Sequence, residues 1–116
     1  MLIVHALAEL YGCPPVIEDA TALAEAAKTA ARSVGADTVG EFQVRYEPHG
    51  LTVAVFLAES HIIITTWPEH RLALIDVLMC NSEMDYKQVV RQIRERICPD
   101  GDLVMHEVPR NIADSA

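Results

Sequence analysis

The sequence is poor in cysteine and in basic residues and has no long apolar run, and each shortage excludes a class of protein. Its three cysteines, Cys13, Cys80 and Cys98, form no close pair along the chain, which makes a poor disulfide framework and a poor zinc signature. We therefore expect the reducing conditions of the cytoplasm. No apolar run approaches the length that crosses a membrane, and the first residues lack the basic start of a signal peptide.

Basic residues are outnumbered by acidic ones. The chain has 9 Lys and Arg against 17 Asp and Glu, so its formal net charge is −8 at pH 7. Because proteins bind nucleic acid through clustered Lys and Arg, we expect no nucleic-acid partner and no membrane partner. What remains is a small-molecule ligand, and an acidic protein favours a cationic one only weakly.

The composition is that of a folded globular protein: 51% of the residues are apolar and 22% are charged. The 116 residues predict a single domain, residues 1–116, with no internal repeat, low-complexity segment or linker. Alternating or continuous apolar runs predict strands, and apolar residues at helical spacing predict helices. The expected strands span 2–10, 38–46, 51–58, 62–66, 72–80 and 103–108, and the expected helices run from about Ile17 to Gly35 and from 82–85 to 97.

This order of elements predicts an α+β fold. We expect a two-layer sandwich in which a mainly antiparallel sheet carries two helices on one face. The strands are so apolar that the other face of the sheet also needs cover, which favours a dimer formed by stacking two sheets. From Pro109 onward the sequence reads as a polar, frayed tail.

One stretch, residues 59–69, combines polar chemistry with strand formers. It begins with Glu59-Ser60-His61, continues as a β-branched run and ends at Trp67-Pro68-Glu69. Ser60 is expected at the turn between two strands. Such a serine is either an ordinary turn residue or a nucleophile held against the carbonyl of Glu59, and spacing alone leaves both open.

The same stretch, followed by Ile75-Asp76 and Cys80, resembles the prokaryotic S-adenosylmethionine decarboxylases, small pyruvoyl-dependent lyases of spermidine and polyamine synthesis. The resemblance covers most of the chain, from His5-Ala-Leu-Ala-Glu9 to His106-Glu107. It implies a proenzyme that cuts itself between Glu59 and Ser60 into a β-chain, 1–59, and an α-chain, 60–116. Ser60 would become a covalent pyruvoyl cofactor, whose ketone forms a Schiff base with the substrate amine. Two αβ units would form a homodimer.

The resemblance also implies roles for other residues. Cys80 matches the position of the proton donor, although an isolated cysteine is more often a small buried hydrophobe. Glu69 matches a residue that binds the ribose, and Tyr46 lies near the position of a ring that stacks on the adenine. Glu9 is expected to face the cationic end of the substrate. His61 either helps to organise the site or is only a hydrogen-bonded structural residue.

Two positions depart from the family pattern. Thr65 replaces a histidine that is expected to assist self-processing, and a threonine hydroxyl does not titrate near neutral pH. Thr52 replaces a serine that supports processing, and this change keeps the hydroxyl. Processing is then slow, absent or assisted by another group, such as His61 or His49.

These departures keep three alternatives open. The substrate is arginine or ornithine instead of S-adenosylmethionine, or the chain is an uncleaved homologue that acts as a binding or partner subunit. A metal site built from the five histidines is the least favoured, because none of them shows close ligand spacing in the sequence. We therefore predict no metal.

Overall fold

The computed structural model describes residues 1–81 and 83–113. Its elements are β1 (Leu2–Tyr11), the short 3-10 helix η1 (Pro15–Glu18), α1 (Ala20–Ser33), β2 (Thr38–Arg45), β3 (Leu51–Leu57), β4 (Ser60–Trp67), η2 (Pro68–His70), β5 (Leu72–Leu78), α2 (Tyr86–Ile97) and β6 (Asp102–Asn111). In the described part of the chain, no helix is long and apolar enough to span a bilayer.

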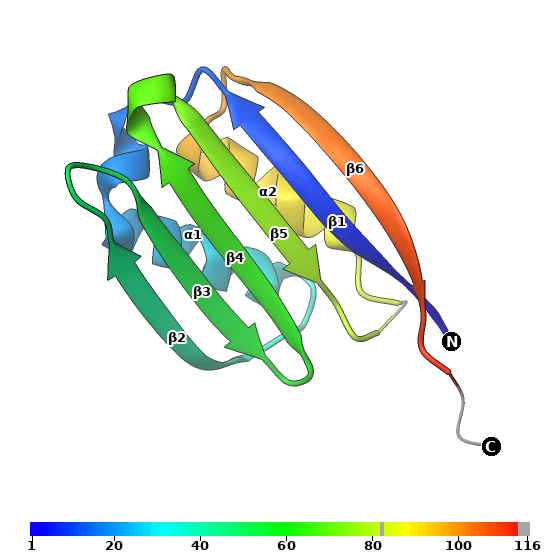
Figure 1. Ribbon diagram of the computed structural model, residues 1–116. Coiled ribbons are helices and arrows are strands. Elements are labelled where there is room, and N and C mark those ends of the chain that lie inside the picture. The colour runs from blue at the N-terminus through cyan, green and yellow to red at the C-terminus, as the bar shows by residue number, and fades with distance from the viewer. Residues whose placement is uncertain (82, 114–116) are drawn as a thin grey trace.

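The strands form one sheet in the order β2-β3-β4-β5-β1-β6, and every neighbouring pair is antiparallel. Both long helices lie behind this sheet in Figure 1, which leaves its other face open toward the viewer. The predicted α+β two-layer sandwich is confirmed. The first strand lies between β5 and the last strand, β6, so Leu2 near the start of the chain pairs with Asn111 at the end of β6.

The core lies between the sheet and the helices, because the strands alternate buried and exposed positions. From the strands it takes mainly Val, Ile and Leu side chains. From α1 it takes a stripe of alanines, whose small side chains let the helix approach the sheet closely. The buried residues of the two helices are Ala20, Leu23, Ala24, Ala26, Ala27, Ala30, Ala31, Val89, Val90, Ile93 and Ile97.

The ends of the helices differ in part from the prediction. The first helix begins at Ala20 and not near Ile17, because residues 15–18 form the short 3-10 helix and Asp19 caps α1 by accepting a hydrogen bond from the Ala22 amide at 3.1 Å. It ends as predicted before Gly35, which has a φ of 83°. The predicted start of the second helix includes residue 82, outside the described residues. Within the described part, Asp85 is its N-cap.

The prediction of a frayed tail from Pro109 was wrong. The strand β6 continues to Asn111, and Pro109 pairs with Val4 of β1. Proline is tolerated there because β6 is an edge strand, where a residue without an amide hydrogen leaves no ladder partner unsatisfied.

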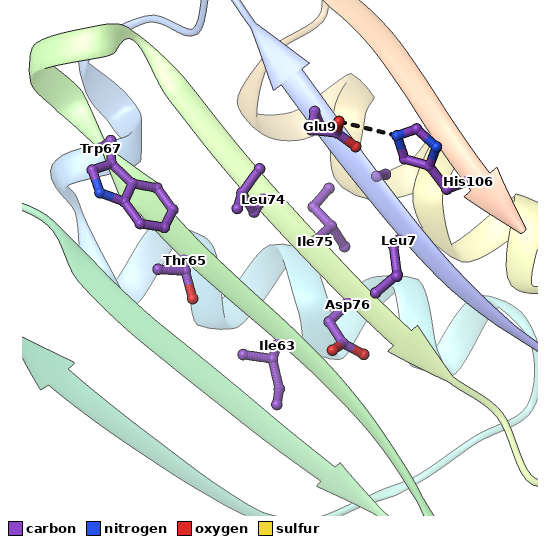
Figure 2. Close-up of a pocket in the computed structure, with 10 residues that line it drawn as sticks. Leu7, Glu9, Ile63, Thr65, Trp67, Leu74, Ile75, Asp76 and His106 are labelled. Atoms are coloured by element: carbon purple, nitrogen blue, oxygen red, sulfur yellow. Dashed lines mark hydrogen bonds and ion pairs between the residues drawn. The ribbon is translucent and has the colours of Figure 1, made fainter. Parts of the chain in front are cut away.

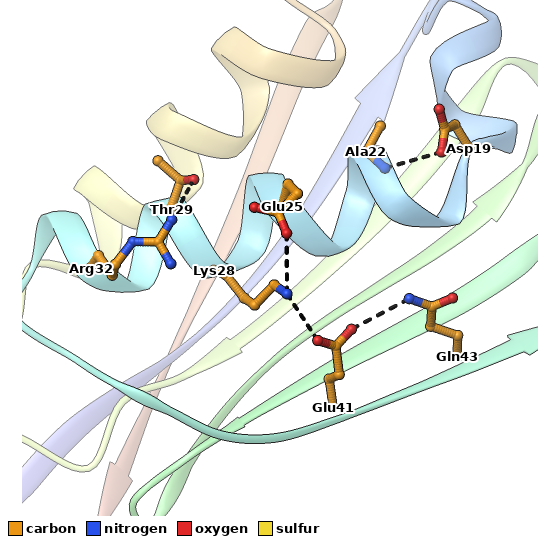
Figure 3. A network of polar contacts seen from close by, with 8 residues as sticks. All are labelled: Asp19, Ala22, Glu25, Lys28, Thr29, Arg32, Glu41 and Gln43. Carbon is orange, nitrogen blue, oxygen red and sulfur yellow. Dashed lines mark hydrogen bonds and ion pairs between the residues drawn. The ribbon is translucent and has the colours of Figure 1, made fainter.

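A polar network joins α1 to the edge strand β2 (Figure 3). The Lys28 ammonium lies 3.2 Å from a Glu25 carboxylate oxygen and 2.9 Å from one of Glu41, and Glu41 also accepts from Gln43. The hydrogen bond from Lys28 lowers the pKa of Glu41, and the same bond raises the pKa of Lys28. Because these groups are exposed, we expect the network to orient β2 and to add little to stability.

Gly101 carries a prediction about stability. It lies in the turn between α2 and β6, where a Cβ atom would overlap the Cys98 sulfur and the Tyr11 carbonyl oxygen. The backbone oxygen cannot move without disturbing the β1–β6 ladder. Gly101→Ala should therefore lower the free energy of unfolding by about 3 kcal/mol in urea denaturation. The control is Gly40→Ala, whose Cβ would meet open space. Equal stability of the two variants would contradict this packing.

Candidate active site

The predicted nucleophile lies at a tight hairpin. Leu57 of β3 pairs with Ser60 of β4, so only Ala58 and Glu59 form the turn. Glu59 has a φ of 59°, in the left-handed region that costs a residue with a side chain roughly 1–2 kcal/mol. Ser60 itself is 8% exposed. The peptide between Glu59 and Ser60 thus joins a strained residue to a nearly buried hydroxyl, an arrangement typical of functional turns.

The structure brings Cys80 to this turn. The Cys80 backbone amide donates to the Ser60 hydroxyl oxygen at 2.7 Å, and the Cys80 thiol donates to the Ala58 carbonyl oxygen at 3.4 Å. The pairing of β4 with β5 causes this contact. His61 of β4 is opposite Leu78 of β5, so Cys80, two residues after Leu78, lies beside the start of β4 and the β3–β4 turn. The thiol is partly exposed. A hydroxyl, a thiol and the Glu59–Ser60 peptide therefore lie within one small volume.

A hollow of about 340 Å³ opens beside Ser60 and Cys80. It lies at the end of the sheet, on the helix side, and its wall includes Asp37 and Met84. Neither residue was predicted as part of the site. Both belong to loops that follow or precede a helix, and only the tertiary fold brings these loops to the β3–β4 turn.

Other predicted residues lie at the opposite end of β4. The Thr52 hydroxyl lies 3.1 Å from that of Thr65 and 2.9 Å from that of Tyr46, so the three form a hydrogen-bonded chain. Glu69 follows β4 and lies 3.7 Å from His49. Five residue steps along β4 separate Thr65 from Ser60, roughly 17 Å at the usual rise. In a single chain these residues cannot touch Ser60.

Glu9 lies far from Ser60 as well. It pairs with Leu74 of β5, and its carboxylate lies 3.1 Å from a ring nitrogen of His106 on β6. Both residues line a second pocket of about 470 Å³ on the open face of the sheet (Figure 2). Thr65 and Trp67 belong to the same pocket.

His61 belongs to a network on the open face. Its Nε2 lies 3.0 Å from Asp76 Oδ1, and His5 Nε2 lies 2.6 Å from the same oxygen. These ligand atoms lie within 4.8 Å of one another, so the fold gives two histidines and an aspartate the spacing of a metal site, which their sequence positions did not indicate.

The hydrogen bonds of His5 favour a network without a metal. Arg110 Nη1 lies 3.3 Å from His5 Nδ1, and a guanidinium only donates. The Nδ1 atom must therefore accept, which puts the ring proton on Nε2, where it is donated to Asp76. A metal would need the lone pair of that nitrogen, and metal-binding histidines usually have an acceptor rather than a cation behind them.

The remaining cysteines, Cys13 and Cys98, are buried next to each other although they are far apart in the sequence. Their thiols donate to the carbonyl oxygens of Leu10, at 3.4 Å, and Tyr11, at 3.9 Å. Burial first, and then the contact with the Cys98 thiol, raise the pKa of Cys13 to about 12. A thiol with this pKa stays protonated at neutral pH.

Fold and site together define a class: a small antiparallel α+β sandwich with a serine at a strained hairpin turn and a cysteine in contact with it. A sequence profile described as S-adenosylmethionine decarboxylase matches residues 4–111. The chain belongs to the S-adenosylmethionine decarboxylase family.

Individual relatives agree with this assignment. The chain is 33% identical over 115 residues to an S-adenosylmethionine decarboxylase proenzyme of Parasynechococcus marenigrum, covering 96% of this chain and 90% of the relative. It is 40% identical over 97 residues to the proenzyme of Pyrobaculum arsenaticum, covering 82% and 78%.

Solved structures share the fold. The crystal structure of the adenosylmethionine decarboxylase of Aquifex aeolicus matches with a TM-score of 0.82 and 29% identity, over 97% of this chain and 93% of that one. A Trypanosoma brucei enzyme structure matches with a TM-score of 0.57 and 17% identity, over 81% of this chain and 41% of that one, which shows the fold alone.

Proposed function

We propose that this chain cuts itself between Glu59 and Ser60 and then decarboxylates S-adenosylmethionine. The observation that carries the proposal is the hairpin turn, where a left-handed Glu59 precedes a nearly buried serine whose hydroxyl lies 2.7 Å from the Cys80 amide nitrogen. The relatives support it, because they are named proenzymes of S-adenosylmethionine decarboxylase.

The residues at the turn fit a pyruvoyl group derived from Ser60. The side chain is small, its oxygen has a backbone donor, and the hollow of about 340 Å³ leaves room for a ligand beside it. Once formed, this group supplies an electrophilic ketone that no encoded side chain carries and that accepts electrons as CO2 departs. Before cleavage, the Cys80 amide would hold in place the Ser60 oxygen that attacks the Glu59 carbonyl and then leaves with the Glu59 carboxylate.

Cys80 is suited to deliver the proton that replaces the lost carboxylate. Its thiol is partly exposed, lies at the rim of the hollow and is 3.4 Å from the carbonyl oxygen of Ala58. The short hydrogen bond from its own amide to Ser60 Oγ keeps the thiol within reach of the reacting atoms. Cys80 would thereby position the Ser60 hydroxyl before cleavage and supply the proton during decarboxylation.

The predicted homodimer would complete the site. Side chains directly opposite each other on antiparallel strands lie on the same face of the sheet. By this rule, several exposed apolar residues of different strands all lie on the open face. These are Phe42, Val44, Phe56, Trp67, Val104 and Val108, all at least 37% exposed. A two-fold axis near the middle of this face would bring the Thr52–Thr65–Tyr46 end of one chain to the Ser60–Cys80 end of the other.

The decisive experiment combines intact mass with substrate assays. Mass spectrometry of the purified protein should give two chains, 1–59 and 60–116, with a ketone in place of the amine at the start of the second. Carboxyl-labelled S-adenosylmethionine, arginine and ornithine should then be compared for CO2 release, and we expect release from S-adenosylmethionine. A chain that stays whole and inactive with all three substrates would refute the proposal in favour of a non-catalytic homologue.

The dimer carries a prediction of its own. Ile63 lies on the open face, between Ala54 of β3 and Asp76 of β5, in the middle of the expected interface. Ile63→Lys should weaken the dimer by about a hundredfold, since burying an unpaired ammonium costs roughly 3 kcal/mol. Analytical ultracentrifugation measures this change, with Thr21→Lys on the exposed side of α1 as the control. Unchanged association of Ile63→Lys would show that this face is not the interface.

A further inference from the structure

The two cysteines that the proposed mechanism does not use lie side by side in the core. Cys13 follows β1, Cys98 is the C-cap of α2, and both are free thiols. Their sulfurs donate to the carbonyl oxygens of consecutive residues at the end of β1, Leu10 and Tyr11, at 3.4 and 3.9 Å, and the two thiols contact each other. Because a thiol is a weak donor, these bonds hold the sulfurs only loosely.

The backbone around the pair is fixed by contacts that do not involve sulfur. The Cys13 amide donates to the Arg71 carbonyl oxygen at 2.9 Å, and Arg71 Nε donates back to the Cys13 carbonyl oxygen at 3.2 Å. On the other side, a Cβ atom at Gly101 would overlap both the Cys98 sulfur and the Tyr11 carbonyl oxygen. The missing side chain of Gly101 thus leaves the space in which the Cys98 sulfur reaches the end of β1.

The proposed cleavage places the two cysteines on different chains. Cys13 belongs to residues 1–59 and Cys98 to residues 60–116. After cleavage, strand pairing and core packing hold the two chains together, with β1 of the first chain between β5 and β6 of the second. A bond between the two sulfurs would restore the covalent link that cleavage removes.

We propose that Cys13 and Cys98 form a modification site, at which a low-molecular-weight disulfide oxidises the two thiols to a disulfide that ties residues 1–59 to residues 60–116. The joining of two chains rests on the proposed function, because it requires the cut before Ser60. The disulfide itself does not, since the same two sulfurs meet in an uncut chain.

Oxidised glutathione is a suitable oxidant. One cysteine thiolate attacks a sulfur of oxidised glutathione and releases one glutathione; the second thiolate then attacks the protein sulfur of this mixed disulfide and releases the other. Two protein thiols thereby lose two electrons and two protons, and one oxidised glutathione becomes two glutathione molecules. Cys98 precedes the exposed Pro99 and Asp100, so local opening of this turn gives access. Burial raises the pKa of the Cys13 thiol to about 12, which makes its thiolate scarce and the reaction slow.

The test exposes the purified wild-type protein to oxidised glutathione, blocks the remaining thiols with N-ethylmaleimide in denaturant and measures mass without reductant. Residues 1–59 and 60–116 should appear as one species, lighter by about 2 Da than their sum, and dithiothreitol should separate them. After trypsin, the peptide 1–28 should be linked to the peptide 97–110, and neither should carry N-ethylmaleimide.

Variants and alternative links complete the experiment. Cys80→Ala should keep the link, and Cys13→Ala should lose it. Peptides 1–28 and 97–110 that both remain alkylated, that carry glutathione, or that are linked to the Cys80 peptide 72–87 would overturn the proposal. An uncut chain in which 1–28 is linked to 97–110 would refute cleavage and support the disulfide. Cut chains that separate without reductant after oxidation would do the reverse, so the two failures are distinguishable.

Discussion

Ser60→Ala is expected to give one intact chain that releases CO2 from S-adenosylmethionine no faster than the uncatalysed background. The Ser60 hydroxyl is the nucleophile adjacent to the Glu59 carbonyl, and the ketone is made from the Ser60 residue itself, so without the hydroxyl no ketone forms. The variant should still fold, because alanine fits the nearly buried position and loses only the acceptor of the Cys80 amide at 2.7 Å. Intact mass and circular dichroism measure the two results.

The control for this variant is Ser33→Ala at the end of α1. Its hydroxyl also makes one short hydrogen bond, to the Ala30 carbonyl oxygen at 2.7 Å, and it lies outside the proposed site. Ser33→Ala should split and turn over like the wild type. A Ser60→Ala chain that still separates into 1–59 and 60–116 would remove Ser60 from the mechanism, whatever the activity of the relatives.

Local patterns in the sequence were sufficient for the fold. The alternation along 51–57 and 60–67 comes from strands with one buried face, and the alanine stripe of α1 from a helix that packs closely on a sheet. The end of β6 was missed because Pro109 normally stops a strand, and only its position at the sheet edge removes that conflict.

The candidate site depended on contacts that no local pattern specifies. The resemblance pointed to Ser60 and Cys80, and the pairing of β4 with β5 brings them together. By contrast, Asp37 has no motif around it, and its proximity to Ser60 depends on the register of three strands. The contact between His5 and Asp76 likewise requires β1 to lie beside β5, a choice of strand order that periodicity does not encode.

The fold also separates the predicted site residues into two groups, although the sequence analysis assigned them to a single site. Ser60 and Cys80 lie at one end of the sheet, whereas Thr65 and Glu69 lie at the other. In the proposed dimer, Thr65 would lie near Ser60 of the neighbouring chain and not near Ser60 of its own chain. A hydroxyl chain through Thr52 orders this end without providing a base near neutral pH.

Cys80→Ala is expected to separate self-cleavage from decarboxylation. The variant keeps the backbone amide that donates to Ser60 Oγ, so the chain should still split into two parts. It loses the thiol, and loss of a positioned general acid lowers kcat by about 10²- to 10⁴-fold. The residual reaction should also put the proton on the wrong atom in part of the turnovers, which mass spectrometry of the products detects.

The matched control is Cys13→Ala. Burial raises the pKa of the Cys13 thiol to about 12, and the thiol donates to the Leu10 carbonyl oxygen, remote from the hollow. Its removal should lower stability and leave kcat of the folded enzyme unchanged. Normal turnover in Cys80→Ala would show that a group other than the thiol delivers the proton. A Cys80→Ala chain that folds but does not split would instead show that the thiol contact with Ala58 is needed to hold the turn for cleavage.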